Sequence, residues 1–438
     1  MKFTVVSKTG WILLAGLIAI PFVLWAMIQP LDERFSTSYM TLTSLGRLVG
    51  IASMVCFSLN VILTARLKFI ETLFGGLNKV YIAHHLIGGI ALVVILTHPL
   101  VLALRTMIVS PHDAALQLIP FMNDTMTTIG ILSLWLFITL MILTLYVKLP
   151  YKTWLLTHKF MGLVLLGIII HIILGSNDIN ADMRLKVYSW GLMGLASLAY
   201  LYRTILPRVL VKRYDYTVTE VRSLPGGIVR FVLTPKSKAI RFRSGQFIFV
   251  SFRAEGFSHE FHPFTVSSNS KESGLVITVK SLGAYTATLV KFGPDMVGMP
   301  VKVEGAYGRF NFENFPAKKQ VWVGGGIGIT PFLSMAADVR APFQVDLYYT
   351  TKSQSEIIDS EYLLQLIEAS GGSLRVIPYV ADINGFLTAE KIKEYSGDLT
   401  ETDILVCGPP PMMFALKKQL KSLGVRASRI HSEEFSMS

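Results

Sequence analysis

Long apolar stretches, almost free of charged residues, dominate the first 210 residues of this 438-residue chain. Six of them are close to the roughly 20 residues that a helix needs to cross the hydrocarbon core of a bilayer. They cover residues 11–28, 48–63, 80–104, 127–147, 155–174 and 187–206. Only 16% of the residues are charged and the mean hydropathy is +0.51, whereas soluble domains usually carry about a quarter charged residues. The sequence therefore predicts a membrane part built as a six-helix bundle.

The charges between these stretches predict the orientation of the bundle. Basic residues gather at the chain start and in alternate loops: Lys2, Lys8, Arg66, Lys68, Lys79, Lys148, Lys152, Lys159, Arg203, Arg208, Lys212 and Arg213. Acidic residues occupy the other loops: Asp32, Glu33, Asp113, Asp124, Asp178 and Asp182. Because basic loops stay in the cytoplasm, we expect a multi-pass protein of the cell (inner) membrane with its N-terminus and C-terminal half in the cytoplasm. No small-x-small cleavage site follows the first stretch, so we expect it to be retained.

Composition argues against two other classes of protein. The excess charge of +12 lies mostly in the membrane part, and no basic stripe in the remainder suggests a nucleic-acid partner. The two cysteines, Cys56 and Cys407, are far apart, so no disulfide framework is expected. There is no C-x-x-C-H motif, so any haem is held without covalent attachment.

Four histidines lie inside the third and fifth stretches. His84 and His98 are 14 residues apart in one, and His158 and His171 are 13 residues apart in the other. At about 1.5 Å rise per residue, the members of each pair lie roughly 20 Å apart along their helix. One metal ion cannot span that distance, but two haems fit it, each held between one histidine from each helix. Polar residues at helix contacts are the alternative, although ionisable residues inside lipid usually mark function.

A neighbouring histidine competes for the inner site. His85 adjoins His84, but His84-x-x-x-Gly88 repeats the pattern His158-x-x-x-Gly162, so we favour His84. His85 would then face a neighbour or a propionate. Glycines at these two positions would let a flat macrocycle approach the backbone closely.

Two arginines lie at opposite ends of the second stretch. Haem propionates are anionic, and Arg pairs well with carboxylates. We therefore expect Arg47 beside the outer haem and Arg66 beside the inner one. A role as an interfacial anchor that snorkels to the membrane surface is the alternative for Arg66.

Beyond residue 211 the pattern changes to short alternating strands, punctuated by Gly and Pro, at 216–221, 229–233, 246–252 and 276–280. This pattern predicts a small antiparallel barrel. Within it, the segment 262–268 offers an aromatic ring and hydroxyls that can stack on a flavin and bind its ribityl or phosphate groups. Gly283 could open a helix whose N-terminus attracts the pyrophosphate. The candidate FAD residues are His262, Pro263, Phe264, Thr265, Lys280, Gly283 and Thr286.

A glycine-rich turn then joins a buried strand to a helix, and strands at 343–350, 374–380 and 404–407 alternate with helices. This order predicts a doubly wound α/β sheet, in which bare backbone approaches a dinucleotide diphosphate. The candidate residues are Gly324, Gly325, Gly326, Ile327, Gly328, Thr330, Pro331, Cys407, Gly408 and Pro409. For Cys407, a buried structural thiol is the alternative. The tail at 430–438 either returns over the flavin with Phe435 or is disordered.

In this order and spacing, the motifs resemble those of the ferric reductase and NADPH oxidase superfamily in its short bacterial form. The C-terminal half resembles the ferredoxin–NADP reductase fold, and the resemblance covers nearly the whole chain. The domains that we expect are a haem-binding bundle at 1–210, an FAD-binding barrel at 211–315 and an NAD(P)H-binding α/β domain at 316–438.

The resemblance implies a role for each matching residue. His84 with His158 would ligate the inner haem b, and His98 with His171 the outer one. Arg47 matches the outer-haem arginine of the oxidases. Phe435 would stack on the isoalloxazine and yield to nicotinamide, with Cys407 at the same catalytic site. No calcium-binding extension is seen, and no Arg suits a 2′-phosphate, for which Lys352 is the nearest candidate, so NADPH is favoured over NADH only on that residue.

We therefore predict a transmembrane NAD(P)H oxidase that passes electrons through FAD and two haem b groups to oxygen outside, giving superoxide. Flavin converts the two-electron hydride into the single electrons that haem accepts. A ferric-chelate reductase, and a quinone or partner-protein reductase with the same electron path, are the alternatives. A six-helix transporter with a regulatory nucleotide domain would need broken helices along a polar path, and the apolar stretches offer histidines instead.

Overall fold

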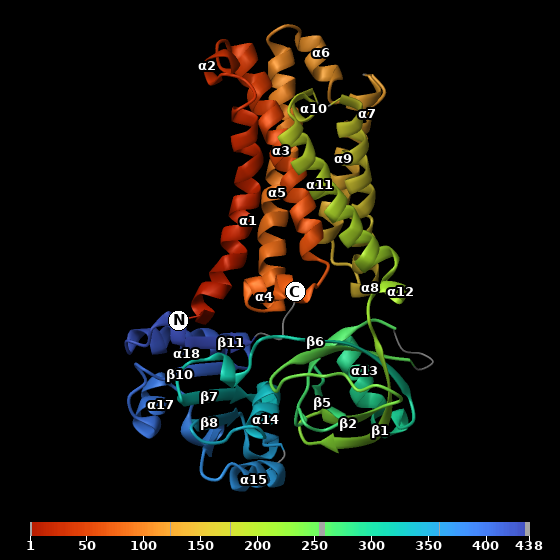
Figure 1. Cartoon of the computed structure of the whole chain (residues 1–438). Helices are drawn as coiled ribbons and strands as arrows, with labels where there is room; N and C mark the ends of the chain where they lie inside the picture. The colour runs from red at the N-terminus through yellow and green to blue at the C-terminus, as the bar shows by residue number, and fades with distance from the viewer. Residues whose placement is uncertain (1, 123, 176, 254–258, 359, 434–438) are drawn as a thin grey trace. The chain divides into compact units, whose positions relative to one another are not determined.

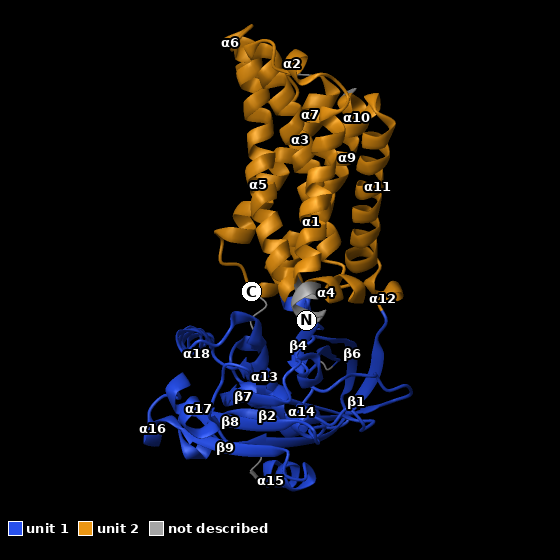
Figure 2. Ribbon diagram, turned by 60° about the vertical axis from the view of Figure 1, so that its left-hand side comes forward, with its two compact units in different colours: residues 1–7, 75–78, 212–438 blue, residues 8–74, 79–211 orange. Residues whose placement is uncertain are grey.

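The computed structural model describes residues 2–122, 124–175, 177–253, 259–358 and 360–433. The chain forms two compact units (Figure 2). One holds the apolar helices, in residues 8–74 and 79–211, and the other holds two β-sheets, in residues 212–438, together with 1–7 and 75–78.

The apolar unit is a helical bundle whose elements follow one another as in Figure 1. Its helices are α1 (Lys2–Ala26), α2 (Leu31–Arg34), α3 (Ser38–Leu63), α4 (Lys68–Phe74), α5 (Leu77–Met107), α6 (Pro111–Leu116), α7 (Thr125–Leu145), α8 (Tyr151–Lys159), α9 (Met161–Gly175), α10 (Asn177–Ala181), α11 (Met183–Tyr200), the π-helix η1 (Leu201–Ile205) and α12 (Pro207–Leu210).

Within the described residues, five segments are long and apolar enough to cross a membrane. They are Lys8–Ala26, Ser38–Leu63, Leu77–Met107, Thr125–Leu145 and Tyr151–Gly175. The sixth predicted span is present as α11, which continues into η1 and packs against α3. It is less apolar than the others because Arg184 and Lys186 lie near its start.

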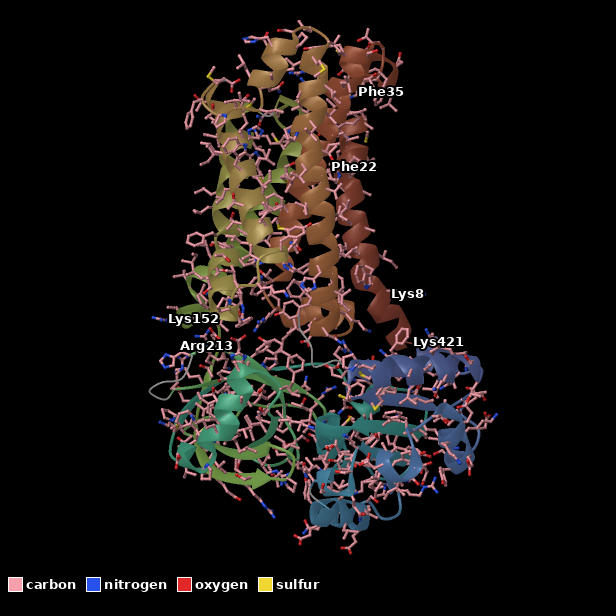
Figure 3. All side chains as sticks on the ribbon, turned by 180° about the vertical axis from the view of Figure 1, so that it is seen from behind. Lys8, Phe22, Phe35, Lys152, Arg213 and Lys421 are labelled. Carbon is pink, nitrogen blue, oxygen red and sulfur yellow. The ribbon has the colours of Figure 1, made fainter. Side chains whose placement is uncertain are left out.

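Large apolar side chains face outward along the bundle, as a lipid environment requires. Ile12 is 70% exposed, Val93 63% and Leu166 51%. In Figure 3, carbon dominates the middle of the bundle, while nitrogen and oxygen atoms are frequent toward its ends and throughout the other unit.

Helix α3 is the centre of the bundle. In its most apolar stretch 56% of the residues are buried, against 17–22% in the other four segments. Phe57 of α3 packs edge-to-face on Phe137 of α7, with ring centroids 5.9 Å apart. Val164 of α9 and Ala196 of α11 complete the same buried cluster. Backbone carbonyls of α3 therefore lie where side chains of its neighbours can reach them.

Two acidic loop residues act as helix caps. Asp124 accepts a hydrogen bond from the N–H of Thr127 (2.8 Å), and Asp182 accepts one from the N–H of Leu185 (3.1 Å). Each carboxylate satisfies a backbone donor that the first turn of a helix leaves without an intrahelical partner. These caps set where α7 and α11 begin.

The fifth predicted span is not one helix, so the expectation of a single helix through His158 and His171 is wrong. Helix α8 ends at Lys159 and α9 begins at Met161. The hydroxyl of Tyr200 donates to the carbonyl of Lys159 (2.7 Å), which takes the place of a helical N–H donor at the break. A side chain inserted into the hydrogen-bond ladder thus separates the two histidine-bearing segments.

The other unit begins with a six-stranded antiparallel sheet of order β4-β3-β6-β1-β2-β5. A bridge between Val266, which follows β4, and Ile277 of β5 joins the two ends of this order. The sheet therefore curls into the predicted barrel. Its elements are β1 (Tyr214–Leu224), β2 (Ile228–Pro235), β3 (Phe247–Phe252), β4 (His262–Thr265), β5 (Leu275–Lys280), α13 (Ala284–Phe292), η2 (Gly293–Met296) and β6 (Pro300–Tyr307).

A five-stranded parallel sheet of order β11-β10-β7-β8-β9 follows. Helices α14 and α15 contribute to the buried cluster on one face, and α17 and α18 to that on the other, as in a doubly wound fold. Its elements are η3 (Phe312–Asn314), β7 (Lys319–Gly325), η4 (Gly326–Ile329), α14 (Thr330–Ala336), β8 (Gln344–Thr351), η5 (Gln354–Glu356), α15 (Ser360–Ala369), β9 (Leu374–Val380), α16 (Ala381–Asn384), α17 (Ala389–Ser396), β10 (Asp403–Cys407), α18 (Pro410–Ser422), η6 (Ala427–Arg429) and β11 (Ile430–Glu433).

Three strands escaped sequence analysis: β4, which pairs with β3 at one end of the barrel order, β6 and β11. Strand β6 lies between β1 and β3 in the barrel, and β11 extends the parallel sheet beyond β10. Strand β11 is only four residues long, and His431 within it bonds the buried Asp403 (Nε2 to Oδ1, 3.0 Å). A strand of four residues is too short to show a period that a sequence pattern could reveal.

The barrel core generates a stability prediction. Phe231 is fully buried and packs on Phe252, with ring centroids 5.3 Å apart. Phe231→Ala should lower the free energy of unfolding by about 3–5 kcal/mol through lost burial and a cavity. Chemical denaturation of the detergent-solubilised chain, monitored by the release of flavin, measures this change in the free energy of unfolding.

Phe386→Ala is the matched control, because that ring is 88% exposed. It should change the free energy of unfolding by no more than about 0.5 kcal/mol. Equal losses in the two variants would contradict the assigned barrel core.

Candidate functional site

The outer pair of predicted haem ligands has a defined hydrogen-bonding state. Nδ1 of His98 lies 2.7 Å from the carbonyl oxygen of Gly46, and Nδ1 of His171 lies 2.9 Å from that of Met126. A carbonyl can only accept, so each Nδ1 carries the proton and donates it. Nε2 of each ring then keeps a free lone pair, which is the form that ligates a metal.

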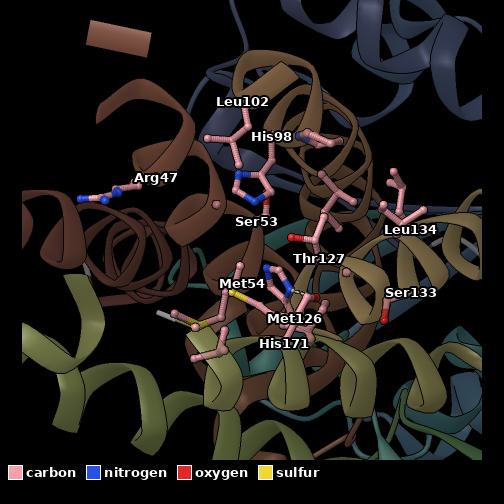
Figure 4. A pocket seen from close by; sticks show the side chains of 18 of the residues that line it. Arg47, Ser53, Met54, His98, Leu102, Met126, Thr127, Ser133, Leu134 and His171 are labelled. Carbon is pink, nitrogen blue, oxygen red and sulfur yellow. Dashed lines mark hydrogen bonds between the residues drawn. The ribbon is translucent and has the colours of Figure 1, made fainter. Parts of the chain in front are cut away.

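Both of these rings line one cavity of about 470 Å³ between α3, α5, α7 and α9. Figure 4 shows His98 and His171 on two sides of the same hollow. The cavity falls within the size range of ligand pockets, about 300–1,000 Å³, and Ile95, Phe137 and Ile168 give it apolar walls. Two neutral imidazoles facing an apolar hollow fit a haem held by two axial nitrogens.

The inner pair also fits a single metal. The ring centroids of His84 and His158 are 6.3 Å apart. Two imidazoles that share one metal at about 2 Å from each nitrogen have centroids about 6 Å apart. Nδ1 of His84 donates to the carbonyl of Asn60 (3.1 Å), and Nδ1 of His158 lies 3.4 Å from Oγ1 of Thr144.

The structure distinguishes His84 from His85. The His84 ring is partly buried and oriented by the Asn60 carbonyl, whereas His85 is exposed. The ring centroids of the two histidines are 5.8 Å apart. Of the two, His84 has the bonded Nδ1 that orients an axial ligand.

The predicted role of two glycines is wrong. A Cβ built at Gly162 would lie 2.0 Å from the ring of Tyr200, and one at Gly88 would lie 3.1 Å from the amide of Asn60. Both glycines therefore make room for protein side chains rather than for a macrocycle.

Arg47 lines the outer cavity as expected, but its guanidinium has a protein partner. Its Nη1 lies 2.9 Å from Oδ1 of Asp178. The other oxygen of that carboxylate, Oδ2, accepts from the indole of Trp25 (2.9 Å) and lies 3.6 Å from Nη1 of Arg34. The side chain of Arg47 extends away from the two imidazoles in Figure 4. Arg66, at the other end of α3, donates through Nε to the hydroxyl of Tyr81 (2.7 Å).

Sequence analysis missed a second cavity arginine. Arg105 lies two turns after His98 on α5 and lines the same cavity. Its nearest bonded group is the hydroxyl of Thr106 (3.4 Å), and no carboxylate of a described residue pairs with it. The spacing of seven residues, which places two side chains on one helix face, was the signal available in the sequence.

The barrel places the predicted flavin residues on β4, at one end of the strand order, and around the start of α13. Phe264 is only partly buried, so its ring can offer a face to a flavin, while Thr265 is buried beside it. The hydroxyl of Thr286 accepts from the N–H groups of Leu282 and Gly283 and thereby shapes the turn before the helix. Thr286 thus acts on the backbone of this turn, and Lys280 ends the strand that precedes it.

His262 stacks on Tyr285, with ring centroids 3.6 Å apart and an angle of 22° between the planes. Burial lowers the pKa of His262, although the carboxylate of Glu260, 3.5 Å from Nε2, opposes the shift. The imidazole is therefore neutral near pH 7. Burial likewise raises the pKa of Tyr285, so both rings stay uncharged where a flavin nucleotide would lie against them.

The glycine-rich turn and the end of β10 meet at the carboxyl edge of the parallel sheet. Gly324 and Cys407 are paired in register across β7 and β10. A Cβ at Gly328 would lie 2.4 Å from the carbonyl oxygen of Cys407. Gly326 has φ +53°, which a side chain would strain. These loops flank the point where strand order reverses, which is where doubly wound sheets bind ligands.

Cys407 is fully buried in this junction, and burial raises the pKa of its thiol well above the ordinary value. It is a neutral thiol rather than a thiolate nucleophile. Pro409 caps α18, and Pro331 lies in the first turn of α14. Phe435 lies outside the described residues.

The two sheet domains of this unit are joined by hydrogen bonds. The buried hydroxyl of Ser334 on α14 donates to the carbonyl of Ser268 in the barrel (2.8 Å). Ser270 donates to the carboxylate of Asp338 (3.1 Å). These bonds connect the α/β domain, which carries the glycine-rich turn, to the barrel, which carries the predicted flavin residues.

Three protein families match the chain in succession. Residues 49–169 match "Ferric reductase like transmembrane component", residues 213–312 match "FAD-binding domain", and residues 322–418 match "Oxidoreductase NAD-binding domain".

Individual relatives match parts of the chain. The glycine betaine monooxygenase reductase subunit of Pseudomonas aeruginosa is 29% identical over 208 residues, which are 44% of this chain and 56% of that protein. NADPH oxidase 1 of Mus musculus is 29% identical over 147 residues, 33% of this chain and 24% of that protein. The match thus spans little more than half of the first relative and a quarter of the second. A flavohemoglobin structure from Malassezia yamatoensis is similar in fold alone, with a TM-score of 0.51, 16% identity and coverage of 93% of this chain and 98% of that one.

A ferric-reductase membrane domain followed by FAD-binding and NAD-binding domains defines a multi-pass, NAD(P)H-dependent transmembrane oxidoreductase. With its homology to NADPH oxidases, the chain belongs to the ferric reductase and NADPH oxidase superfamily. The same matches support FAD, NAD(P)H and haem b as its cofactors. The family resemblance found in the sequence is therefore confirmed.

The end of β8 generates a prediction about dinucleotide choice. Lys352 follows β8 directly and is exposed. If it binds a 2′-phosphate, Lys352→Ala removes a charge-assisted hydrogen bond and should raise the KM for NADPH about tenfold, with little change for NADH. Ferricyanide reduction by the purified full chain, measured with each dinucleotide in turn, gives the KM for NADPH and the KM for NADH.

Lys393→Ala is the control, since Lys393 is an equally exposed lysine on α17. Lys393→Ala should leave the KM for NADPH and the KM for NADH unchanged. A parallel rise for NADPH and NADH in Lys352→Ala would exclude recognition of the 2′-phosphate by this residue.

Proposed function

We propose that this protein is a transmembrane NAD(P)H oxidase that carries electrons from cytosolic NAD(P)H through FAD and two bis-histidine haems to oxygen on the outer side, giving superoxide. FAD and haem supply the redox chemistry, since a flavin takes a hydride and releases single electrons that haem can carry. The chain's own groups bind these cofactors, hold their ligand nitrogens unprotonated and exclude water.

One observation carries the proposal. All four proposed ligands, His84, His98, His158 and His171, have an oxygen within hydrogen-bonding distance of Nδ1. Axial histidines of metal sites almost always use their second nitrogen in this way, which leaves Nε2 for the metal. Histidines that merely filled helix contacts would also need a hydrogen-bond partner, but that need does not require Nδ1 to be the bonded nitrogen in all four rings.

Phe264, Thr265 and the His262–Tyr285 stack are the groups that we assign to FAD. The two glycine loops that meet at Cys407 are assigned to the dinucleotide. Cys407 is uncharged there, so its proposed part is to contact the nicotinamide rather than to exchange a proton. With Phe435, it stays a candidate for the hydride-transfer site.

The proposed location is the cell (inner) membrane, with the N-terminus and both nucleotide-binding domains in the cytoplasm. The basic residues near Arg66, Lys148 and Arg203 support this orientation. The cap residues Asp124 and Asp182 would then lie on the outer side.

Reduction of a ferric chelate is a second candidate, favoured by Arg105 of the outer cavity, whose lining also includes the carboxylates of Asp124 and Asp178. Arg47 and Arg105 both line it, and Arg105 has no carboxylate partner in the described part of the chain. Ferric chelates such as ferric citrate are anionic, so this cation would favour their approach. Oxygen is uncharged, so Arg105 would not attract it to the cavity before its reduction.

Replacement of single histidines tests the haem path. His98→Ala or His171→Ala should remove the outer haem and leave the inner one, which NADPH still reduces under nitrogen. His84→Ala or His158→Ala should instead leave an outer haem that NADPH no longer reduces. Pyridine haemochromogen assays and reduced-minus-oxidised spectra of detergent-purified protein measure both effects.

His112→Ala is the control, because His112 is exposed on α6 and lies in a loop between spans. It should keep both haems and full reduction by NADPH. Wild-type protein without haem bands, after expression with adequate haem supply, would refute the proposed function.

The choice of acceptor is tested separately. In air, NADPH oxidation should proceed without added iron and reduce cytochrome c in a reaction that superoxide dismutase suppresses. NADPH consumption that occurs only with ferric citrate would identify the second candidate instead. In that case Arg105→Gln should raise the KM for ferric citrate about tenfold, as the loss of one charge-assisted contact would.

A further inference from the structure

The rings of His98 and His171 each pack against a neighbouring helix through the same two contacts, a backbone carbonyl and a glycine. The ring of His98 lies across one turn of α3, with Nδ1 bonded to the carbonyl of Gly46 (2.7 Å). A Cβ built at Gly50, four residues further on, would lie 2.7 Å from Cε1 of that ring and 2.9 Å from its Nδ1. The imidazole therefore occupies the space that any other residue at position 50 would fill.

The same arrangement recurs on a different helix. The ring of His171 lies across one turn of α7, with Nδ1 bonded to the carbonyl of Met126 (2.9 Å). A Cβ at Gly130, again four residues further on, would lie 2.9 Å from both Cε1 and Nδ1 of the ring. A carbonyl at position i and a glycine at i+4 thus accompany each outer histidine.

Helix geometry explains this register. A carbonyl in mid-helix already accepts the N–H of residue i+4, and its second lone pair is the only one left for an outside donor. Side chains on a helix lean toward its N-terminus, so the side chain at i+4 covers the carbonyl of residue i. Glycine at i+4 uncovers that carbonyl and lets a buried imidazole reach it.

The inner histidines need no such glycine, because they find acceptors of another kind. His84 donates to the carbonyl of Asn60, in the last turn of α3, where the N–H of Thr64 bonds Val61 instead (3.1 Å). His158 lies 3.4 Å from the side-chain hydroxyl of Thr144. The inner level thus uses a helix end and a hydroxyl. The outer level uses two helix carbonyls, that of Gly46 within α3 and that of Met126 in the first turn of α7.

We propose that Gly50 and Gly130 are positioning residues for the outer haem, each opening the backbone carbonyl that fixes the ring of its axial histidine. The inference rests on the proposed function, because it assumes that His98 and His171 ligate haem. It adds that the outer site is specified by two residues that never touch the iron. Without them Nδ1–H loses its acceptor, and the ring cannot hold Nε2 toward the metal.

Gly50→Ala and Gly130→Ala are the test. Loss of a partner that orients a ligand typically weakens metal binding about 10–100-fold, so each variant should be purified without its outer haem. The inner haem should remain and stay reducible by NADPH. Haem per FAD and the low-spin electron paramagnetic resonance spectrum of the oxidised protein report this without any turnover assay.

Gly89→Ala is the matched control, because no atom lies within 4 Å of a Cβ built at Gly89 on α5. Each of the three substitutions replaces glycine with alanine inside a helix and raises its helix propensity. A general effect on helix stability would therefore be the same in the control and in the two test variants. Gly89→Ala should keep both haems and both resonance signals. Haem loss in the control equal to that in the two test variants would overturn the proposal.

Two haems with unchanged resonance signals in Gly50→Ala and Gly130→Ala would also overturn it. FAD content and NADPH–ferricyanide activity show whether each variant has folded, and the two glycines lie on separate helices, so one variant suffices if the other does not accumulate. Thr144→Val should disturb only the inner signal, which distinguishes the two levels. Wild-type protein without haem would defeat the proposed function itself, whereas two haems in every variant would defeat this inference alone.

Discussion

The bundle depends on one requirement: a neutral imidazole among apolar helices has to satisfy one ring nitrogen and leave the other bare. An unsatisfied N–H in such surroundings is costly, and no water is at hand to replace a missing acceptor. His98 and His171 meet the requirement with backbone carbonyls of α3 and α7. The packing of these helices against α5 and α9 therefore fixes ring orientation, and ring orientation defines where a planar cofactor can be held.

The break between α8 and α9 serves the same end. In one straight helix, the fixed rotation per residue would set the angle between the side chains of His158 and His171. The hydroxyl of Tyr200 takes over the carbonyl of Lys159, and Gly162 leaves room for the tyrosine ring. Each histidine can then meet its own partner on α5 and its own acceptor on α7.

In the unit that holds the two β-sheets, close packing of backbone against backbone positions the loops, as hydrogen bonds position the histidine rings in the bundle. Gly328 lies against the carbonyl of Cys407, so the glycine-rich turn and the end of β10 form one continuous edge. The bond from Ser334 to Ser268 holds that edge to the barrel. His262, Tyr285 and Cys407, which lie at these sites, are uncharged, which suits cofactors that bring their own chemistry.

The sequence by itself determined the spans, the pairing of four histidines at two levels and the order of barrel and parallel sheet, because apolar length, residue spacing and strand period are local properties. It left open whether His84 or His85 faces the inner site, and it could not reveal that Arg47 pairs with Asp178. Only the tertiary structure showed the surroundings of the two histidines, the partner of Arg47, the break at Phe160 and the place of Arg105. Three of the four histidines find a backbone carbonyl on another helix, and His158 finds the hydroxyl of Thr144. A carbonyl carries no residue-specific signal in a sequence, and only at the outer level does a glycine accompany it.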